Sequence, residues 1–442
     1  MPERRFFPWN PMSTAPDAHG IRNAQFRQLI DALESLQQAR LPADRALDRF
    51  FRARRFLGSR DRRFIAEGVF GVLRRQRFFR HCLQCVAGEA AAAADLAGLY
   101  LLTQGWSERA LANLLPAPEA ARLGSALRAA QAESLPFAIR QSLPDPLADA
   151  LVHDWGAAQA ESLAIALAGT APLDLRVNTL RTDREALRQR LAGAGIHLEP
   201  TPYAPHGLRR ADRAALFQAP GFQEGAFEVQ DEGSQLLACL VDVPPRGRVV
   251  DFCAGAGGKT LALAMQMDNK GEILACDVIP RKLEELARRA RRAGAHNIRI
   301  QALVDESDAV LRAHRGRYDR VLVDAPCSGS GTLRRNPDLR NRPLDLPALA
   351  TLQGRILRSA AGLVAPGGRL IYATCSVADA ENREVVAGFL REHPDFSHLS
   401  AQVVMAQAGL TLPETLFRDA DFQPTPHVHG TDGFYGAVLQ RA

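Results

Sequence analysis

Strand-like and helix-like segments alternate along the chain from about residue 230 onward. This rhythm constrains the fold more than any other feature, because strands that alternate with helices form a parallel sheet with helices on both faces. The predicted fold class is therefore α/β, with a late strand at 433–439 at or near an antiparallel edge. The other strand-like runs lie near 248–252, 272–276, 298–302, 318–323 and 369–373. The last two contain apolar runs rich in β-branched residues, at 321–323 and 370–372, which are typical of buried parallel strands.

Two cysteine motifs stand at the ends of two of these runs. The sequence Asp-Ala-Pro-Cys-Ser-Gly at 324–329 contains Cys327, and the triplet Thr-Cys-Ser at 374–376 contains Cys375. Ligands of open α/β sheets bind at the carboxyl ends of the strands, so both thiols are expected to point into one crevice. Two cysteines beside a nucleotide-binding loop favour covalent chemistry on a bound substrate.

A glycine-rich loop, Cys-Ala-Gly-Ala-Gly-Gly-Lys-Thr at 253–260, joins the first strand-like run to a helical stretch. A phosphate-binding P-loop would need glycine in place of Cys253, and a dinucleotide fingerprint would need its third glycine in place of Thr260. Kinase, GTPase and dehydrogenase functions are therefore excluded. Asp277 ends the next strand, where an acid can accept hydrogen bonds from both hydroxyls of a ribose. S-adenosylmethionine fits this pattern, because it has a ribose and an adenine but no phosphate.

The length of 442 residues exceeds one comfortable core, so two or three domains are expected. Residues 21–142 carry helical periodicity almost throughout and are predicted to form an all-helical domain behind an N-terminal tail at 1–20. A Leu-Pro-Asp-Pro hinge at 143–146 begins a small α+β module at 143–229. The α/β domain then occupies 230–442.

The net charge of +6 favours a polyanionic partner. Nearly all the basic residues are arginines in an alanine-rich chain, so the clustering of charge says more than the total. We interpret the cluster at 288–292 as a solvated helix face, whereas the one at 334–342 follows Cys327 and is predicted to contact phosphate. The clusters are Arg45, Arg49, Arg52, Arg54, Arg55, Arg60, Arg62 and Arg63; Arg288, Arg289, Arg291 and Arg292; and Arg334, Arg335, Arg340 and Arg342.

Several classes of protein are disfavoured by simple counts. Seven cysteines, an odd number spread over a long chain, do not form a disulfide framework. Cys82 and Cys85 have the spacing of half a zinc site, but no second pair follows, so no metal is expected. No apolar stretch is long enough to span a bilayer, and the first residues lack the features of a signal peptide. We therefore expect a cytoplasmic protein without a membrane partner, and nothing demands more than a monomer.

Taken together, the motifs resemble the RNA cytosine-5 methyltransferases, the Sun/Nop family, and in particular its bacterial RsmB type, which acts on small-subunit ribosomal RNA. The motifs at 324–329 and 374–376 match the family pattern without departure. In the glycine-rich loop, Gly255 and Ala256 replace the alanine and the proline that the family usually carries, so the loop is expected to be less rigid. Further resemblances lie at 229–235, 334–338 and 430–435, and more weakly at 61–65 and 70–74.

The resemblance implies a class I S-adenosylmethionine-dependent methyltransferase domain with a Rossmann-like, mostly parallel seven-stranded sheet. The helical region would be a NusB-like RNA-binding domain, and the small module would help to recognise RNA. Asp308 is a rival acid for the role of Asp305. The implied cofactor contacts are Cys253, Ala254, Gly255, Ala256, Gly257, Gly258, Lys259, Asp277, Asp305 and Asp324.

The resemblance also implies the chemistry. Carbon 5 of cytosine is a weak nucleophile, and a thiolate that adds to carbon 6 turns the ring into an enamine whose carbon 5 can attack a sulfonium methyl group. The RNA family assigns this attack to the Thr-Cys-Ser cysteine, here Cys375, whereas DNA cytosine methyltransferases use a Pro-Cys cysteine, here Cys327. With Cys375 attacking, Cys327 would assist the breakdown of the adduct. Asp324 would hold the exocyclic amine and the protonated ring nitrogen 3.

The sequence thus predicts an RNA 5-methylcytosine methyltransferase whose partner is RNA, foremost 16S ribosomal RNA. A transfer RNA or another ribosomal site is an alternative target. A non-catalytic RNA-binding ribosome-assembly factor is a rival function, against which intact Cys375, Cys327 and Asp324 argue. A DNA cytosine methyltransferase is another rival. The target base has to leave its stack at a cost of about a few kcal/mol, which is smallest in unpaired RNA.

Overall fold

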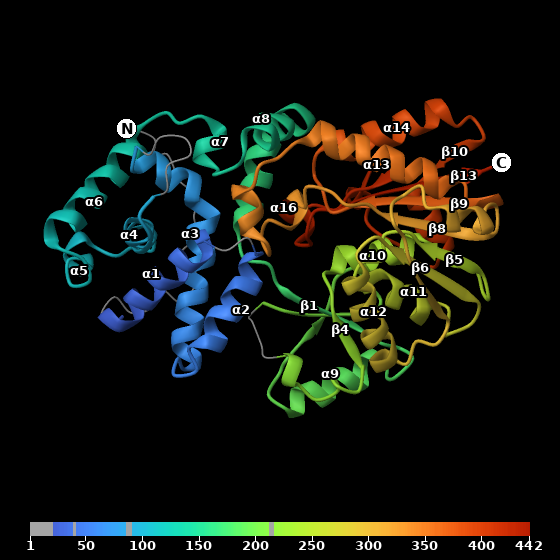
Figure 1. Ribbon diagram of the computed structural model, residues 1–442, viewed down its shortest axis with the longest axis horizontal. Coiled ribbons are helices and arrows are strands. Elements are labelled where there is room, and N and C mark those ends of the chain that lie inside the picture. Colours follow the sequence, from blue (N-terminus) through green and yellow to red (C-terminus); the bar gives the residue numbers. More distant parts are fainter. Residues whose placement is uncertain (1–20, 39–40, 85–90, 212–215) are drawn as a thin grey trace. The chain divides into compact units, whose positions relative to one another are not determined.

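The computed structural model describes residues 21–38, 41–84, 91–211 and 216–442 (Figure 1). The chain forms two compact units. The first consists of residues up to Gly169 together with Leu333–Leu344, and the second of Thr170–Thr332 and Asp345–Ala442. The predicted N-terminal tail at 1–20 lies outside the described residues. The domain boundaries inferred from the sequence stay predictions.

The first unit is helical, as the periodicity of its sequence predicts. Its helices are α1 (Asn23–Gln38), α2 (Ala43–Ala53), α3 (Ser59–Cys82), α4 (Ala93–Thr103), α5 (Glu108–Leu111), α6 (Ala117–Ala132), α7 (Phe137–Arg140) and α8 (Asp145–Ala168). In α1 the apolar residues Phe26, Leu29 and Leu33 recur at spacings of three and four and are buried. They pack with Ile65 and Val69 of α3 in one apolar core. Burial of such one-sided stripes is what stabilises these helices.

The segment Leu333–Leu344 belongs to the helical unit, although it follows the Cys327 motif in sequence. Arg340 in this segment donates a hydrogen bond to the carbonyl of Gln141 at 2.8 Å. Both Arg334 and Arg340 are buried, and burial lowers the pKa of Arg340 to about 9. The prediction that this arginine cluster contacts phosphate is therefore wrong for these two residues, because the protein itself encloses their side chains.

A small antiparallel sheet opens the second unit. Its strands are β1 (Leu173–Val177), β2 (Glu199–Pro200), β3 (Gly207–Arg210) and β4 (Phe227–Val229), in the order β2–β3–β1–β4. Helix α9 (Arg184–Gly193) begins after Asp183, whose carboxylate accepts the backbone N–H of Ala186 at 2.8 Å. Leu187 of this helix packs with Leu175 of β1 in a separate core. The arrangement is the α+β module that the sequence predicts.

The rest of the second unit is built on a mostly parallel sheet (Figure 1). Its strands are β5 (Arg248–Asp251), β6 (Glu272–Asp277), β7 (Ile298–Ala302), β8 (Tyr318–Asp324), β9 (Val364–Thr374), β10 (Phe396–Leu399), β11 (Phe417–Arg418), β12 (Asp421–Phe422) and β13 (Tyr435–Arg441). The order is β11–β12–β13–β9–β8–β5–β6–β7, and β10 also pairs with β13. Strands β5 to β9 pair in parallel, whereas β13 is antiparallel to β9. Seven strands make the predicted sheet, and the two-residue strands β11 and β12 extend it.

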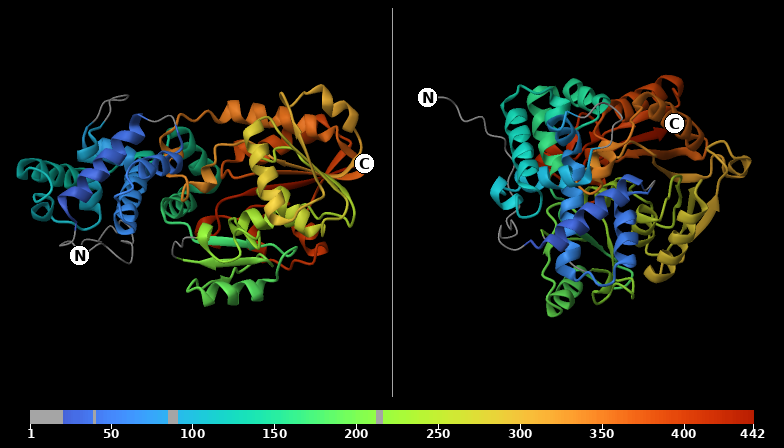
Figure 2. Two further views of the ribbon diagram at one scale, coloured as in Figure 1. Left: turned by 60° about the horizontal axis from the view of Figure 1, so that its bottom comes forward. Right: turned by 60° about the vertical axis from the view of Figure 1, so that its left-hand side comes forward.

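Helices cover both faces of this sheet (Figures 1 and 2). The longer ones are α10 (Glu232–Leu240), α11 (Gly258–Gln266), α12 (Pro280–Ala293), α13 (Leu346–Ala361), α14 (Arg383–Glu392) and α15 (Ala401–Gln407). Because successive side chains of a strand point to opposite faces, Val249 packs in the core with α10 to α12, and Val250 in the core with α13 and α14. Within the described ranges, no helix has the length and apolar character needed to cross a bilayer.

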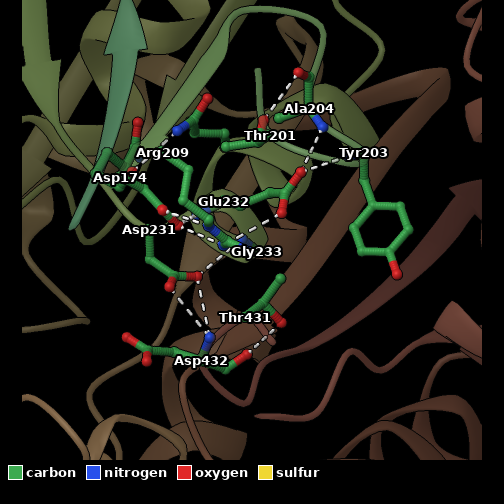
Figure 3. Close-up of polar contacts among 12 residues, drawn as sticks. Asp174, Thr201, Tyr203, Ala204, Arg209, Asp231, Glu232, Gly233, Thr431 and Asp432 are labelled. Atoms are coloured by element: carbon green, nitrogen blue, oxygen red, sulfur yellow. Dashed lines mark hydrogen bonds and ion pairs between the residues drawn. The ribbon is translucent and has the colours of Figure 1, made fainter. Parts of the chain in front are cut away.

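A buried charge network joins the small sheet to the large one inside the second unit (Figure 3). The carboxylate of Asp174 on β1 accepts two hydrogen bonds from Arg209 of β3, each 2.7 Å long. It also accepts the backbone N–H of Glu232 on α10 at 3.0 Å, and the Glu232 carboxylate lies 3.3 Å from the Arg209 guanidinium. Asp231 accepts the backbone N–H of Asp432 and so ties in the C-terminal segment. Since Asp174 and Glu232 are enclosed, Arg209 is the counter-charge that makes their burial tolerable.

Candidate active site

The two predicted cysteines come together at the carboxyl edge of the large sheet. Cys327 follows β8 and Cys375 follows β9, and these strands are parallel neighbours. Their sulfur atoms lie 3.4 Å apart. Both side chains are half-buried, so they are not sealed from solvent. The arrangement gives one reachable site with two adjacent thiols.

A buried carboxylate supports both cysteine loops. Glu381 Oε1 accepts the backbone N–H of Ser328 at 2.8 Å, and its Oε2 accepts the hydroxyl groups of Ser328 and Ser376, each at 2.5 Å. Ser328 directly follows Cys327, and Ser376 directly follows Cys375. Glu381 could not be identified from the sequence, since a single acid in an irregular stretch gives no sign of its burial.

The environment of Cys327 favours its neutral form. The hydrogen bond to Cys375 and burial together raise the pKa of the Cys327 thiol well above its usual range, and the negative charge of Glu381 adds to the shift. A thiol with a raised pKa is a poor nucleophile at neutral pH, because only the thiolate attacks. The site therefore distinguishes its two sulfur atoms.

Lys259 and Asp324 form an ion pair beside the cysteines. Asp324 is the last residue of β8, and its Oδ2 lies 2.7 Å from the Lys259 ammonium on α11. Although burial disfavours its charge, the Asp324 carboxylate raises the pKa of Lys259. The ammonium also lies 5.7 Å from the centre of the Phe434 ring. This buried cation lies within electrostatic reach of Cys375.

The C-terminal segment is hydrogen-bonded to the loop that follows Cys327. Gly331 donates its N–H to the carbonyl of Cys375 at 2.9 Å, and its own carbonyl accepts the N–H of Gly433 at 2.9 Å. A Cβ on Gly331 would lie 2.0 Å from the Gly433 carbonyl oxygen, so the two backbones approach too closely for any side chain. This contact explains in physical terms why the segment 430–435 carries a recognisable motif.

The glycine-rich loop leaves β5 and ends where α11 begins. Gly257 has a φ of +88°, and a Cβ there would lie 2.7 Å from Leu286, so glycine is required. Gly255 has a φ of +55°, but a Cβ there would meet nothing within 4 Å. The loop therefore turns through left-handed backbone conformations beside an open space at Gly255.

Backbone contacts from both sides fix the rest of this loop. The N–H of Ala254 donates to the carbonyl of Cys276 at 2.8 Å, and the carbonyl of Ala256 accepts a hydrogen bond from Arg289 at 2.7 Å. Burial raises the pKa of the Cys253 thiol well above its usual range. Cys253 is thus a loop residue in its neutral form and not a third nucleophile.

The residues after β6 and β7 fit the ribose and adenine of S-adenosylmethionine. Asp277 ends β6, and its two carboxylate oxygens accept the N–H groups of Gly255 and Ile279, each at 2.8 Å. Each oxygen keeps a second lone pair for a hydroxyl group. Val278 and Val304 are large aliphatic side chains that are 52% and 86% exposed on neighbouring strand ends. Exposed apolar surface of this kind suits the face of an adenine ring.

The structure separates the two rival acids that follow β7. Asp308 uses both carboxylate oxygens for backbone N–H groups, those of Val304 at 2.9 Å and Val310 at 3.0 Å, and these bonds lower the pKa of its carboxyl. Asp305 is exposed, and its Oδ1 accepts the N–H and hydroxyl groups of Ser307 at 2.7 Å. Asp305 is thus the better placed of the two to meet a ligand.

Arg176 is another residue of the site that the sequence does not reveal. This arginine lies on β1 and is buried, and it donates hydrogen bonds to the carbonyl of Gly258 at 2.8 Å and to the side chain of Gln230. Burial lowers the pKa of Arg176 to about 10. The small sheet therefore reaches the start of α11. The alternating pattern at 173–177 predicts the strand but not this contact.

The described part of the chain contains no group of three or more histidine, cysteine or acidic side chains that could hold a metal ion. Cys82 is buried at the end of α3. Its partner in the Cys-x-x-Cys spacing, Cys85, lies outside the described residues.

Comparisons with known proteins match the two sheets of the second unit. A family model described as 16S rRNA methyltransferase RsmB/F matches residues 238–440. A second model, described as the ferredoxin-like domain of RsmF/B-like methyltransferases, matches residues 143–214. Both cysteines, Lys259, Asp277 and Asp324 fall inside the first match.

Curated relatives and a solved structure agree with these matches. The probable ribosomal RNA small subunit methyltransferase B of Bacillus subtilis is 36% identical over 273 residues, which cover 60% of this chain and 59% of that protein. Ribosomal RNA small subunit methyltransferase B of Pseudomonas putida is 36% identical over 61% of this chain and 59% of its own length. The crystal structure of PH0851 has a TM-score of 0.76 at 24% identity and covers 96% of this chain and 99% of that one, which shows a shared fold.

Proposed function

The chain belongs to the RsmB/F methyltransferase family, and from this premise we propose that it transfers a methyl group from S-adenosylmethionine to carbon 5 of a cytosine in 16S ribosomal RNA. The observation that carries the proposal is the pair of thiols, Cys327 and Cys375, with sulfur atoms 3.4 Å apart. Two adjacent thiols suit a reaction that forms a covalent cysteine–cytosine adduct and then breaks it.

The cofactor would lie along the loops that follow β5, β6 and β7. Asp277 would accept its ribose hydroxyls, Asp305 would stand near its edge, and Val278 and Val304 would cover its adenine. The backbone of the loop 253–259 would approach its methionine part. When bound, S-adenosylmethionine supplies an electrophilic methyl group on a positively charged sulfur.

Cys375 is the proposed nucleophile. Its thiolate gives an electron pair to carbon 6 of the cytosine, and the π pair between carbons 5 and 6 moves to carbon 5, which becomes nucleophilic. A thiolate needs positive potential nearby. Lys259 supplies it, because its ammonium is buried and is coupled electrostatically to Cys375.

Asp324 is proposed to hold the target base. Its side chain is 32% exposed, so a flipped base could reach it. The contact with Lys259 engages Oδ2. The carboxylate could then accept hydrogen bonds from the exocyclic amine and the protonated ring nitrogen 3, which stabilises the charge that develops as the sulfur adds.

Cys327 is proposed to assist the release of the product. In that step carbon 5 loses its proton to water, the C–H electron pair forms the double bond between carbons 5 and 6, and the carbon–sulfur pair returns to Cys375. The Cys327 thiol can donate a hydrogen bond to the departing sulfur, since its raised pKa keeps the proton in place. A neutral thiol at this distance is what such a role requires.

The class of RNA rests on the relatives. Their names assign them to the ribosomal small subunit, and we extend this target to the present chain. The net charge of +6 favours the phosphate backbone. A transfer RNA or another ribosomal site is the alternative target.

A deletion strain tests the proposal. Bisulfite sequencing of total RNA should show the loss of one methylated cytosine in 16S ribosomal RNA, and a plasmid copy of the gene should restore it. The plasmid copy carrying Cys375→Ala should not restore it. An unchanged 16S pattern with a lost cytosine in transfer RNA would select the alternative target. No lost methylation in any RNA would refute the proposed reaction.

A further inference from the structure

We propose that Glu381 is a positioning residue that holds the Cys327 and Cys375 loops face to face, so that the two thiols stay adjacent and Cys375 alone attacks. This inference rests on the proposed function and deepens it, since it assigns a role to a residue that acts through both cysteines. Glu381 is completely buried.

Glu381 accepts hydrogen bonds from both cysteine loops. Burial of a carboxylate is unfavourable unless donors meet its oxygens. The donors to Glu381 come from both loops, with Ser328 beside Cys327 and Ser376 beside Cys375. The two serine hydroxyls share the same oxygen, so the two loops cannot separate without leaving a buried charge short of donors. One carboxylate thereby couples the positions of two thiols that come from different strands.

Glu381 itself is held by several neighbouring side chains. Gln353 on α13 donates to Glu381 Oε1 and to the carbonyl of Pro326, each at 3.0 Å. The Tyr372 hydroxyl donates to the Glu381 carbonyl at 2.6 Å. The neighbouring residue Asn382 accepts a hydrogen bond from Thr374 at 2.5 Å and holds the other end of the Cys375 triplet. A residue fixed from this many sides can impose its own position on the thiols.

The charge of the Glu381 carboxylate also affects the ionisation of Cys327. A buried negative charge next to Cys327 opposes a second negative charge on its sulfur. The hydrogen bond to Cys375 and burial are the larger causes of the raised pKa of Cys327, and the Glu381 carboxylate adds to them. A serine or glutamine at position 381 could also hydrogen-bond to the loops, but only a carboxylate adds this repulsion. The charge is therefore the part of Glu381 that a merely structural role would not need.

The experiment measures thiol reactivity in the full-length protein without RNA or cofactor. Alkylation by iodoacetamide is followed from pH 6 to pH 10, and peptide mass spectrometry gives the extent at each cysteine. In Glu381→Gln we expect the Cys327 profile to move to lower pH by about one unit, a roughly tenfold gain in its alkylation at a fixed pH below the midpoint. Glu381→Asp keeps the charge and should restore the wild-type profile. The control Glu384→Gln removes an exposed carboxylate three residues away and should change nothing.

The outcomes separate position from charge. Glu381→Gln and Glu381→Asp with the same shifted profile would overturn the electrostatic part, and two unshifted profiles would overturn it as well. If Glu381→Ala does not fold, Glu381→Gln still decides, because its side chain has nearly the same shape.

The consequence for the reaction is tested with an RNA that contains 5-fluorocytosine. Carbon 5 of this base cannot lose a proton, so the covalent adduct persists and can be measured. We expect wild type to form the adduct only through Cys375, and Glu381→Gln to form it at least about tenfold more slowly, with a minor fraction through Cys327. Unchanged speed and site in Glu381→Gln would overturn the proposal. Absence of any adduct in wild type would instead overturn the proposed function, and the alkylation profiles would still report on Glu381.

Discussion

The sulfur atoms of Cys327 and Cys375 lie 3.4 Å apart, although 48 positions separate the two residues in the sequence. The distance follows from topology, because parallel strands β8 and β9 end at the same edge of the sheet. We propose that Cys375 attacks the base and that Cys327 assists product release, and substitution of each cysteine can distinguish these two roles.

Replacement of each cysteine by serine should have opposite effects on the covalent adduct. Cys375→Ser is expected to lower methyl transfer by roughly a thousandfold or more and to abolish the adduct, because the proposed nucleophile is gone. Cys327→Ser is expected to accumulate adduct, because a serine hydroxyl is a weaker acid than a thiol and its shorter bond keeps it farther from the departing sulfur, which it therefore stabilises less. Denaturing gels with labelled RNA measure both. Adduct in Cys375→Ser but not in Cys327→Ser would assign the attack to the Pro-Cys cysteine, as in DNA methyltransferases.

Two glycines of the cofactor loop should respond differently to alanine. In Gly257→Ala the new methyl group meets Leu286 at 2.7 Å and the backbone keeps a φ of +88°, so we expect a loss of about 2–3 kcal/mol of unfolding free energy and weak cofactor binding. Gly255→Ala meets no neighbour within 4 Å and should lose only about 1 kcal/mol. Urea unfolding and calorimetric titration with S-adenosylmethionine check both. Equal losses in the two variants would contradict this account of the loop.

The charge network of Figure 3 should be essential to the stability of the second unit. Arg209→Met leaves the buried carboxylates of Asp174 and Glu232 without their cation and should cost about 3–5 kcal/mol of unfolding free energy. The matched control is Arg210→Met, the next residue of β3, whose side chain points to the opposite face of the small sheet and which should cost under about 1 kcal/mol. Denaturant unfolding measures both. A small effect at Arg209 would mean that the acids hold protons in the folded state.

The buried carboxyl group of Asp251 should make the free energy of unfolding depend on pH. Burial raises the pKa of this carboxyl to about 7, and the nearby charge of Asp324 adds to the shift, while a hydrogen bond from Thr260 at 2.7 Å opposes it. The folded state therefore keeps a proton between about pH 4 and pH 7 that the unfolded state releases, so folding stability falls as pH rises through this window.

Asp251→Asn removes this titration. Between pH 5 and pH 7, the unfolding free energy of wild type should decline by roughly 2 kcal/mol relative to that of the variant. Urea unfolding at a series of pH values gives the difference curve. A flat difference would show that Asp251 is ionised in the folded protein throughout this range.

Much of the fold follows from local patterns. The run at 298–302 coincides with β7, and the runs at 272–276 and 318–323 each fall one residue short of a strand end. The centre of β6 and the second half of β8 are predictable because a buried parallel strand is apolar along its length. Strand β7 lies at the edge of the sheet and alternates isoleucine with Arg299 and Gln301, which is the pattern of a partly exposed strand. The meeting of Cys327 and Cys375 is also predictable, since a motif at a strand end inherits its place from the sheet.

Contacts between distant segments could not be predicted in this way. Glu381, Arg176 and Arg340 are charged residues, and charge in a sequence normally indicates exposure. Each is buried because donors or acceptors from remote segments meet it, as Gln141 meets Arg340. A single sequence contains no periodic signal for such pairs, and the misplaced phosphate role of Arg334 and Arg340 has this origin.

The path of Leu333–Leu344 limits how the molecule can be divided. The chain leaves the second unit after Thr332, spends twelve residues with the helices of the first, and returns at Asp345. A fragment that starts at Thr170 would therefore keep this excursion but lose Gln141, the acceptor that Arg340 meets there. A cut between Gly169 and Thr170 would expose an arginine that the full-length protein buries, so we do not expect the second unit to be stable as an independent fragment.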